Sequence, residues 1–144
     1  MGKLIEGKWH SDDAVITDTK GRFVRKATTF RGGLSDDGSS AFPVEAGRYH
    51  LLVAAACPWA HRVVLTRALR GLTDAVSMSV AHPLMLEHGW DFSQGERPTP
   101  DVDYLYQVYL RADAAYSGRA TVPVLWDTKA ATIVNNESRE IMRM

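Results

Sequence analysis

Residues 49–81, with the sequence YHLLVAAACPWAHRVVLTRALRGLTDAVSMSVA, decide the fold of this chain. Residues 49–55 are almost all apolar, as in a buried strand. Pro58 then stands at a helix start, where a proline costs no backbone hydrogen bond, and apolar residues recur at helical spacing as far as Leu72. Gly71 suits a left-handed helix cap, and Val76–Ala81 has the pattern of a second strand. Strand, Cys-Pro, helix and strand in this order predict the opening of a parallel α/β unit.

Length and composition restrict the possible classes of protein. The chain has 144 residues, the size of one domain, and 17 basic residues balance 17 acidic ones. We therefore expect no nucleic-acid partner, and no apolar run approaches the roughly 20 residues that cross a bilayer. A single cysteine excludes an internal disulfide and a Cys-x-x-Cys redox pair, and the histidines show no metal-binding spacing. We therefore expect no bound metal. Because the N-terminus lacks a signal-peptide pattern, we expect a cytoplasmic protein.

Two regions follow from the composition of the chain. Residues 1–48 are polar and rich in Gly, Asp and Ser, and they predict an extended arm that wraps a neighbouring domain or a partner. Residues 49–144 predict an α/β domain, interrupted by an inserted segment at 82–120. We expect Asp101 or Asp103 to cap a helix in this insert. Two strands at 122–126 and 132–134 follow, and then a helix that begins at Glu137, is capped by Asn135 or Asn136 and continues to the last residue.

Cys57 is the first candidate for chemistry, because it lies between a strand end and a helix start. Unpaired N–H groups and the positive end of the helix dipole favour a thiolate there, and His61 and Arg62 add positive potential. The alternative is a small buried apolar residue, which is the commonest role of a lone cysteine.

Three further sites are candidates for binding a ligand, and they are more informative together with Cys57 than alone. Pro123 follows Val122 at the front of a strand, and in a thioredoxin-type fold a cis proline here leaves the preceding backbone free to pair with a peptide-like thiol. An edge-strand proline in the ordinary trans form is the alternative. Glu137-Ser138 opens a helix after a strand, where a carboxylate and an ammonium group can be held; plain helix capping is the alternative. Trp90 lies in a loop and is the best ligand candidate among the aromatic residues of the insert, whereas Tyr106 and Tyr109 fit core or interface packing better.

Several motifs together indicate a known family. They are Cys57-Pro58-Trp59-Ala60-His61-Arg62, His88-Gly89-Trp90-Asp91-Phe92, Leu105-Tyr106-Gln107, Tyr116-Ser117-Gly118-Arg119, Val122-Pro123-Val124-Leu125-Trp126-Asp127 and Ile133-Val134-Asn135-Asn136-Glu137-Ser138. From about residue 22 to the end, the chain resembles the glutathionyl-hydroquinone reductases, the Xi class of glutathione transferases. The resemblance implies a thioredoxin-like N-terminal domain, a catalytic Cys57, and glutathione contacts from Trp90, Arg119, Val122, Glu137 and Ser138.

The same resemblance implies a reaction. A glutathione-dependent reductase would remove glutathione from an aromatic glutathionyl-hydroquinone through a Cys57 mixed disulfide, with glutathione as co-substrate and no bound cofactor. Two alternatives stay open, namely a broader monothiol thioltransferase and a non-catalytic glutathione-binding module or fragment. Family members continue into an all-helical domain that lines the hydroquinone pocket and builds a homodimer. The chain ends inside the helix after Glu137-Ser138, so we expect that domain to be missing here.

Overall fold

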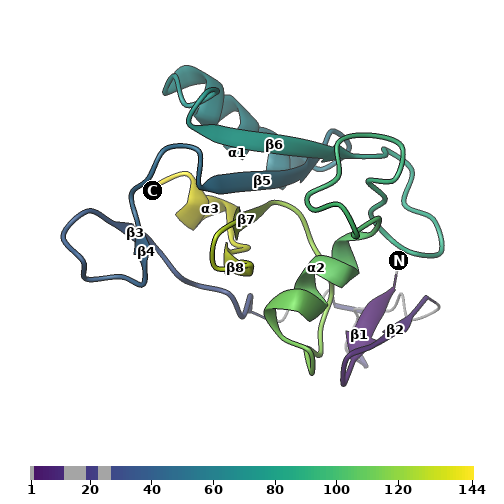
Figure 1. Ribbon diagram of the computed structural model, residues 1–144. Helices are drawn as coiled ribbons and strands as arrows, with labels where there is room; N and C mark the ends of the chain where they lie inside the picture. Colours follow the sequence, from purple (N-terminus) through teal and green to yellow (C-terminus); the bar gives the residue numbers. More distant parts are fainter. Residues whose placement is uncertain (1, 12–18, 23–26) are drawn as a thin grey trace.

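A four-stranded mixed sheet forms the centre of the molecule (Figure 1). The computed structural model describes residues 2–11, 19–22 and 27–144. The strands are β5 (Tyr49–Ala54), β6 (Val76–Ala81), β7 (Val124–Asp127) and β8 (Thr132–Asn135), in the order β6-β5-β7-β8. β5 runs parallel to β6 and antiparallel to β7, and β7 runs antiparallel to β8. The expected opening of a parallel α/β unit is therefore confirmed.

The β5–α1–β6 unit follows the local sequence signals closely. Helix α1 (Pro58–Leu69) starts at the proline, and β6 has the predicted bounds. The helix ends where Gly71 adopts a left-handed φ of 68°. The Gly71 amide donates to the Ala68 carbonyl and the Leu72 amide to the Arg67 carbonyl, which satisfies carbonyl groups that the helix leaves unpaired. A glycine followed by a leucine thus ends this helix in the expected way.

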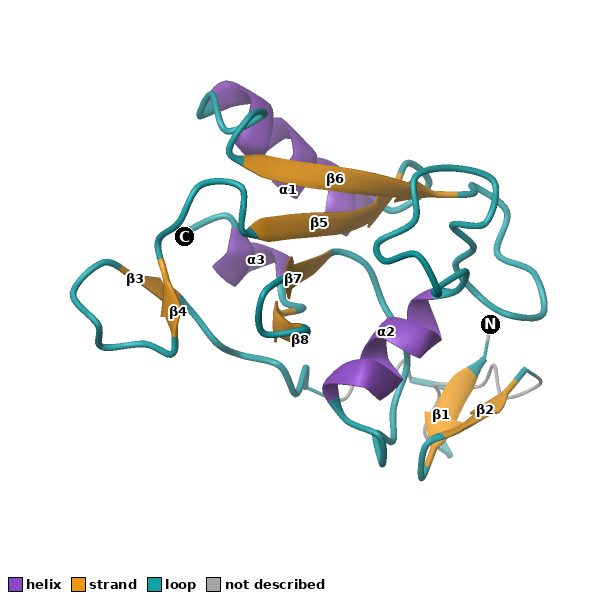
Figure 2. Cartoon of the chain, in the orientation of Figure 1, coloured by secondary structure: helices purple, strands orange, loops and turns teal. Residues whose placement is uncertain are grey.

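Both faces of the sheet are covered near β5, all six residues of which are buried. Successive side chains of a strand point to opposite faces. Tyr49 and Leu51 lie with Val63 of α1 on one face, whereas His50 contacts the Ser77 and Ser79 hydroxyls of β6 on the other. In Figure 2, α1 lies behind β5 and β6, and α3 lies close to β7. The core is therefore built on both sides of β5, directly before the segment that carries Cys57.

The inserted segment forms helix α2 (Leu105–Ala112), and the predicted caps of this helix are wrong. Tyr104 is the N-cap residue, and the Gln107 side chain accepts the amides of Asp103 and Tyr104, both at 2.9 Å. A side chain in the first turn can satisfy these donors as well as a preceding aspartate can. Asp103 instead lies 3.0 Å from Arg97 in an ion pair, and Asp101 lies 3.7 Å from Arg111.

The described part of the N-terminal arm packs against the chain's own domain. It contains β1 (Lys3–Ile5) paired with β2 (Lys8–His10), and β3 (Leu34–Ser35) paired with β4 (Phe42–Pro43). Leu4 is buried and pairs with Gly118, and the β1–β2 hairpin lies beside α2 in Figure 1. Residues 1, 12–18 and 23–26 of the predicted arm lie outside the described residues.

The arm also pairs with the outer edge of the sheet. The Gly32 amide donates to the Val134 carbonyl at 2.8 Å, and the Asn136 amide donates to the Phe30 carbonyl at 3.2 Å. An isolated bridge joins Arg31 to Asn135 between these two bonds. Because unpaired edge groups attract other strands, this pairing protects the β8 edge.

The last helix, α3 (Ser138–Ile141), starts one residue later than predicted. Glu137 has an extended backbone and is itself the N-cap residue, with its side chain accepting the Arg139 amide at 3.5 Å. Asn135, one of the two predicted caps, accepts the Glu137 amide at 2.7 Å and so holds the residue before the helix. Within the described residues, no helix is long and apolar enough to cross a membrane.

Candidate active site

Cys57 is the N-cap residue of α1, directly after the β5 strand. Its carbonyl accepts the amides of Ala60 and His61 at 3.1 and 3.0 Å, and its side chain caps no backbone group. The residue is partly exposed, so the alternative of a fully buried apolar cysteine does not describe it. A thiol at this place can meet a ligand while the first turn of α1 holds its backbone.

Val122 lies opposite Cys57, although 65 residues separate the two in the sequence. The Cys57 thiol donates to the Val122 carbonyl, with 3.6 Å between Sγ and the oxygen. The Val122-Pro123 peptide bond is cis, the form that a thioredoxin-type fold implies and that the sequence pattern alone left open, and β7 begins only at Val124. The Val122 backbone is therefore outside the strand ladder and next to the thiol.

Glu137 and Ser138 meet α1 through Arg62. The Arg62 Nε atom donates to Ser138 Oγ at 3.0 Å, a second guanidinium nitrogen donates to the same oxygen, and this nitrogen lies 3.8 Å from a Glu137 carboxylate oxygen. The guanidinium carbon lies 5.1 Å from the centre of the Trp59 ring. Sequence reasoning placed the charge of Arg62 beside Cys57, whereas the structure directs it to the start of α3. Arg62 is thus a site residue whose role the sequence pattern did not reveal.

Trp90 and Arg119 lie near the two ends of α2. The Trp90 carbonyl accepts the Leu105 amide at 3.0 Å, and the Arg119 carbonyl accepts the Tyr116 hydroxyl at 3.3 Å. Among the described residues, no hydrogen bond joins either of them to Cys57 or Ser138. The structure therefore brings together Cys57 with Val122 and Arg62 with Glu137-Ser138, and the roles of Trp90 and Arg119 stay predictions.

Tyr109 of α2 links the two chain segments that carry Val122 and Glu137. Its hydroxyl donates to the Thr121 carbonyl at 2.8 Å and accepts the Thr121 amide at 3.2 Å and the Asn136 side-chain amide at 3.0 Å. Burial raises the pKa of Tyr109 to about 12, so the hydroxyl stays a donor at neutral pH. The sequence indicated only core packing for this residue, because nothing local to α2 shows that residues 121 and 136 lie beside it.

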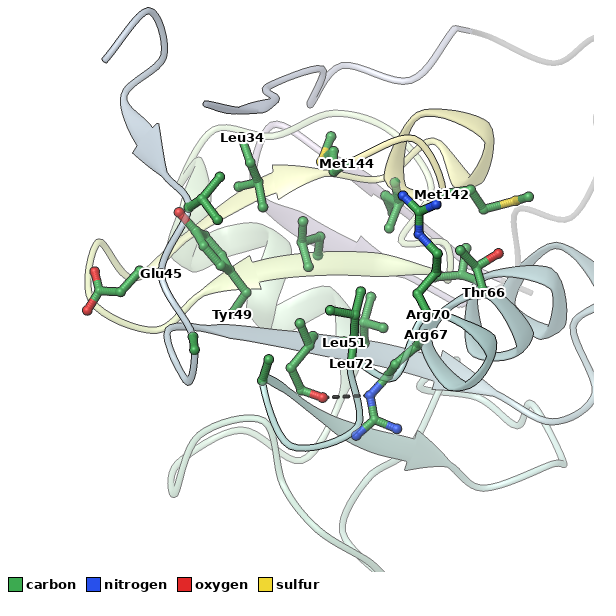
Figure 3. Close-up of a pocket in the computed structure, with 17 residues that line it drawn as sticks. Leu34, Glu45, Tyr49, Leu51, Thr66, Arg67, Arg70, Leu72, Met142 and Met144 are labelled. Atoms are coloured by element: carbon green, nitrogen blue, oxygen red, sulfur yellow. Dashed lines mark hydrogen bonds between the residues drawn. The ribbon is translucent and has the colours of Figure 1, made fainter. Parts of the chain in front are cut away.

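A separate apolar groove of about 290 Å³ lies between α1, the sheet and the end of the chain (Figure 3). Leu51 of β5, Leu72 after α1 and Met142 after α3 line it, and Arg67 and Arg70 lie along one side. Arg67 donates to the Val76 carbonyl at 2.6 Å, the bond drawn in Figure 3. None of the predicted site residues lines this groove, so it is distinct from the thiol site.

Among the described residues, no group of three or more His, Cys, Asp or Glu side chains could hold a metal ion, and several charged side chains instead form ion pairs. Arg31 of the arm pairs with Glu140, and the pKa of this carboxyl is lowered to about 2 by hydrogen bonds from Arg31 and Asn135. The start of α3 is thus contacted by one arginine from the arm and another from α1.

Comparison with known proteins agrees with this geometry. The family model described as the glutathione S-transferase N-terminal domain matches residues 56–144. The chain therefore belongs to the glutathione S-transferase family, and its β5–α1–β6–β7–β8–α3 portion is the thioredoxin-like N-terminal domain of that family.

Several relatives are glutathionyl-hydroquinone reductases or Xi-class transferases. The chain is 50% identical to the glutathionyl-hydroquinone reductase YqjG of Escherichia coli, over all of this chain and 47% of that protein. The structure of the Xi-class transferase from Natrialba magadii superposes with a TM-score of 0.86 at 50% identity, covering 100% of this chain and 44% of the other. The glutathione-bound structure of YqjG gives 0.79 at 44% identity, covering 99% and 44%. The resemblance to the Xi class is confirmed, and the chain spans about half the length of these relatives.

Proposed function

We propose that the protein containing this chain is a glutathione-dependent reductase that removes glutathione from glutathionyl-hydroquinones. One observation carries the proposal: the Cys57 thiol lies at the start of α1, 3.6 Å from the Val122 carbonyl, in a chain 50% identical to a glutathionyl-hydroquinone reductase. A nucleophile needs access, orientation and an environment that favours its ionised form. The partial exposure of Cys57 supplies the access, and its fixed place before α1 supplies the orientation.

The reaction proceeds by two sulfur exchanges. The Cys57 thiolate attacks the glutathione sulfur of the conjugate, forming an S–S bond while the bond from that sulfur to the aromatic carbon breaks. The electron pair goes to the ring carbon, which takes a proton, so the aromatic product is reduced and the two sulfurs are oxidised to a mixed disulfide. A second glutathione thiolate then attacks the glutathione sulfur of this disulfide, releasing Cys57 thiolate and oxidised glutathione. A single cysteine suffices because the second thiol comes from solution.

Glutathione binding would use the two sides of the site. The Val122 backbone, next to Cys57, pairs with the peptide backbone around the glutathione sulfur. Ser138 holds the α-carboxylate of the γ-glutamyl end and Glu137 its ammonium group, while Trp90 and Arg119 contact the remainder of the tripeptide. What supports this placement is that α1 begins directly after Cys57 and that Arg62 of the same helix donates to the Ser138 hydroxyl at 3.0 Å.

The whole protein's partners and location belong to the same proposal. A protein about twice this length would carry the hydroquinone pocket outside this chain and assemble as a homodimer. We place it in the cytoplasm, because a thiol that must return to its reduced form needs a reducing compartment.

The Cys57 step can be tested on this chain. Incubation with oxidised glutathione should add one glutathione, detected by intact mass, and Cys57→Ser should add none. In a protein of the relatives' length, Cys57→Ser should abolish reduction of glutathionyl-hydroquinones. Retained reduction in this variant would exclude the mechanism.

The ligand contacts predict a loss of affinity. Ser138→Ala should weaken glutathione binding by about 1–3 kcal/mol, because a charged group loses a hydrogen bond, and Glu137→Gln should weaken it also. Calorimetry measures both. Unchanged affinity in both variants would remove these two residues from the site.

A broader monothiol thioltransferase is the second candidate, since the partly exposed lone thiol of Cys57 would also attack small mixed disulfides. Turnover of small disulfides without turnover of a glutathionyl-hydroquinone would favour it. Binding of glutathione with no turnover of either substrate would instead indicate a non-catalytic module.

A further inference from the structure

Arg62 reaches from α1 to the first residue of α3 and places two donors on one hydroxyl oxygen. Its Nε atom lies 3.0 Å from Ser138 Oγ, and a second nitrogen of the same guanidinium also donates to this oxygen. The guanidinium carbon lies over the Trp59 ring, 5.1 Å from its centre. The guanidinium is therefore held by contacts with both the ring and the hydroxyl.

These contacts determine where the Ser138 hydroxyl proton points. A guanidinium has only donors, whereas a hydroxyl has one donor and two acceptor positions. Both bonds from Arg62 therefore occupy the lone pairs of Ser138 Oγ and leave its proton directed elsewhere. Ser138 is only 4% exposed, and among the described residues its hydroxyl donates no hydrogen bond. A buried donor without a partner favours a ligand that brings an acceptor.

The local charge favours an anionic acceptor over a neutral one. The Arg62 guanidinium donates to the hydroxyl, and a Glu137 carboxylate oxygen lies 3.8 Å from the same guanidinium. The Arg62 side chain is 36% exposed, so a ligand can approach it. A group that carries a carboxylate and an ammonium on one carbon matches this arrangement of opposite charges.

We propose that Arg62 is a positioning residue that orients the Ser138 hydroxyl proton toward the α-carboxylate of a bound thiol. The protein thereby selects thiols whose amino-acid end carries a free α-carboxylate. This inference rests on the proposed glutathione site and adds to it the residue that makes the site specific for the carboxylate.

Two ligands separate this role from a structural one. Glutathione carries the α-carboxylate, whereas γ-aminobutyryl-cysteinyl-glycine lacks only that group and keeps the thiol and the glycine end. Calorimetry on this chain would measure both affinities for the unaltered protein, Arg62→Gln, Arg62→Lys and Ser138→Ala. Arg70→Gln, which changes an exposed arginine just beyond the same helix, is the matched control.

The expected result is a loss that depends on the ligand. Arg62→Gln should weaken glutathione binding by about tenfold, the effect of one charge-assisted hydrogen bond, and change binding of the analogue less than about twofold. Arg62→Lys, which keeps the charge but not the planar fork, should recover part of the loss. The Arg62→Gln, Ser138→Ala double variant should bind glutathione no more weakly than the weaker single variant, because both act through one hydroxyl.

Other outcomes overturn the inference in distinguishable ways. An equal loss for both ligands would show that Arg62 acts on the fold alone and would leave the proposed function standing. Additive losses in the double variant would separate Arg62 from Ser138. Failure of the unaltered chain to bind glutathione would overturn the proposed site and this inference together. Matching urea midpoints for the variants ensure that folded proteins are compared.

Discussion

Removing the hydroxyl of Tyr109 should destabilise the whole domain. Tyr109→Phe keeps the buried ring but deletes the oxygen that pairs with the Thr121 carbonyl, the Thr121 amide and the Asn136 side chain. A buried polar group without a partner costs about 1–3 kcal/mol. Asn136 is buried and its side-chain oxygen already has no partner, whereas Thr121 is partly exposed and water can reach it. The expected loss in free energy of unfolding is therefore about 2–4 kcal/mol.

Urea denaturation followed by tryptophan fluorescence measures this loss. With a slope of about 2 kcal/mol per molar urea, the midpoint should fall by about 1–2 M. Tyr106→Phe is the matched control on the same helix, because the Tyr106 ring stacks on Trp9 and its hydroxyl makes no hydrogen bond within the described residues. The control should shift stability by less than about 0.5 kcal/mol. Equal midpoints for the two variants would refute the reasoning that the Tyr109 hydroxyl joins these segments.

Two further variants test the sheet. Burial lowers the pKa of His50, so below about pH 6.5 the unfolded chain binds a proton that the folded chain does not. The free energy of unfolding should therefore fall as the pH decreases from that value. His50→Gln should reduce this pH dependence, as measured by denaturation at several pH values. Gly32→Ala should displace the arm, because its Cβ would lie 2.8 Å from the Val134 carbonyl oxygen; hydrogen exchange at residue 32 should accelerate. Gly33→Ala, whose Cβ would meet nothing within 4 Å, is the control, and equal exchange rates in both variants would contradict the close approach.

The elements with strong local signals were predictable from the sequence. α1 begins at the predicted proline and β6 has the predicted bounds, because apolar periodicity, proline and glycine act within a few residues. A common site for Cys57 and Val122 followed only from the resemblance to a thioredoxin-like domain, because no local pattern relates two residues 65 positions apart. The structure places these two residues 3.6 Å apart.

Features that depend on tertiary contacts were not predictable. The cap of α2 uses Gln107 in place of an aspartate, and several side chains near that helix start were chemically able to do this. Strands of two or three residues, such as β3 and β1, are too short to show a period. Arg62 lies close to Cys57 in sequence, but its direction depends on where α3 packs against α1. Local sequence patterns contain no information about where α3 packs against α1.

The bond between the arm and β8 has a consequence for synthesis on the ribosome. The Asn135 side chain donates to the Gly32 carbonyl across 103 residues, and the arm pairs with no other edge of the central sheet among the described residues. At about 5–20 residues per second, roughly 5–20 s pass between the emergence of the two partners. During that interval residues 30–32 have no β8 strand to pair with, and the docking of this part of the arm is a late event. A translational pause before residue 135 would prolong this exposure, whereas a pause after it would let the arm dock before the chain is released.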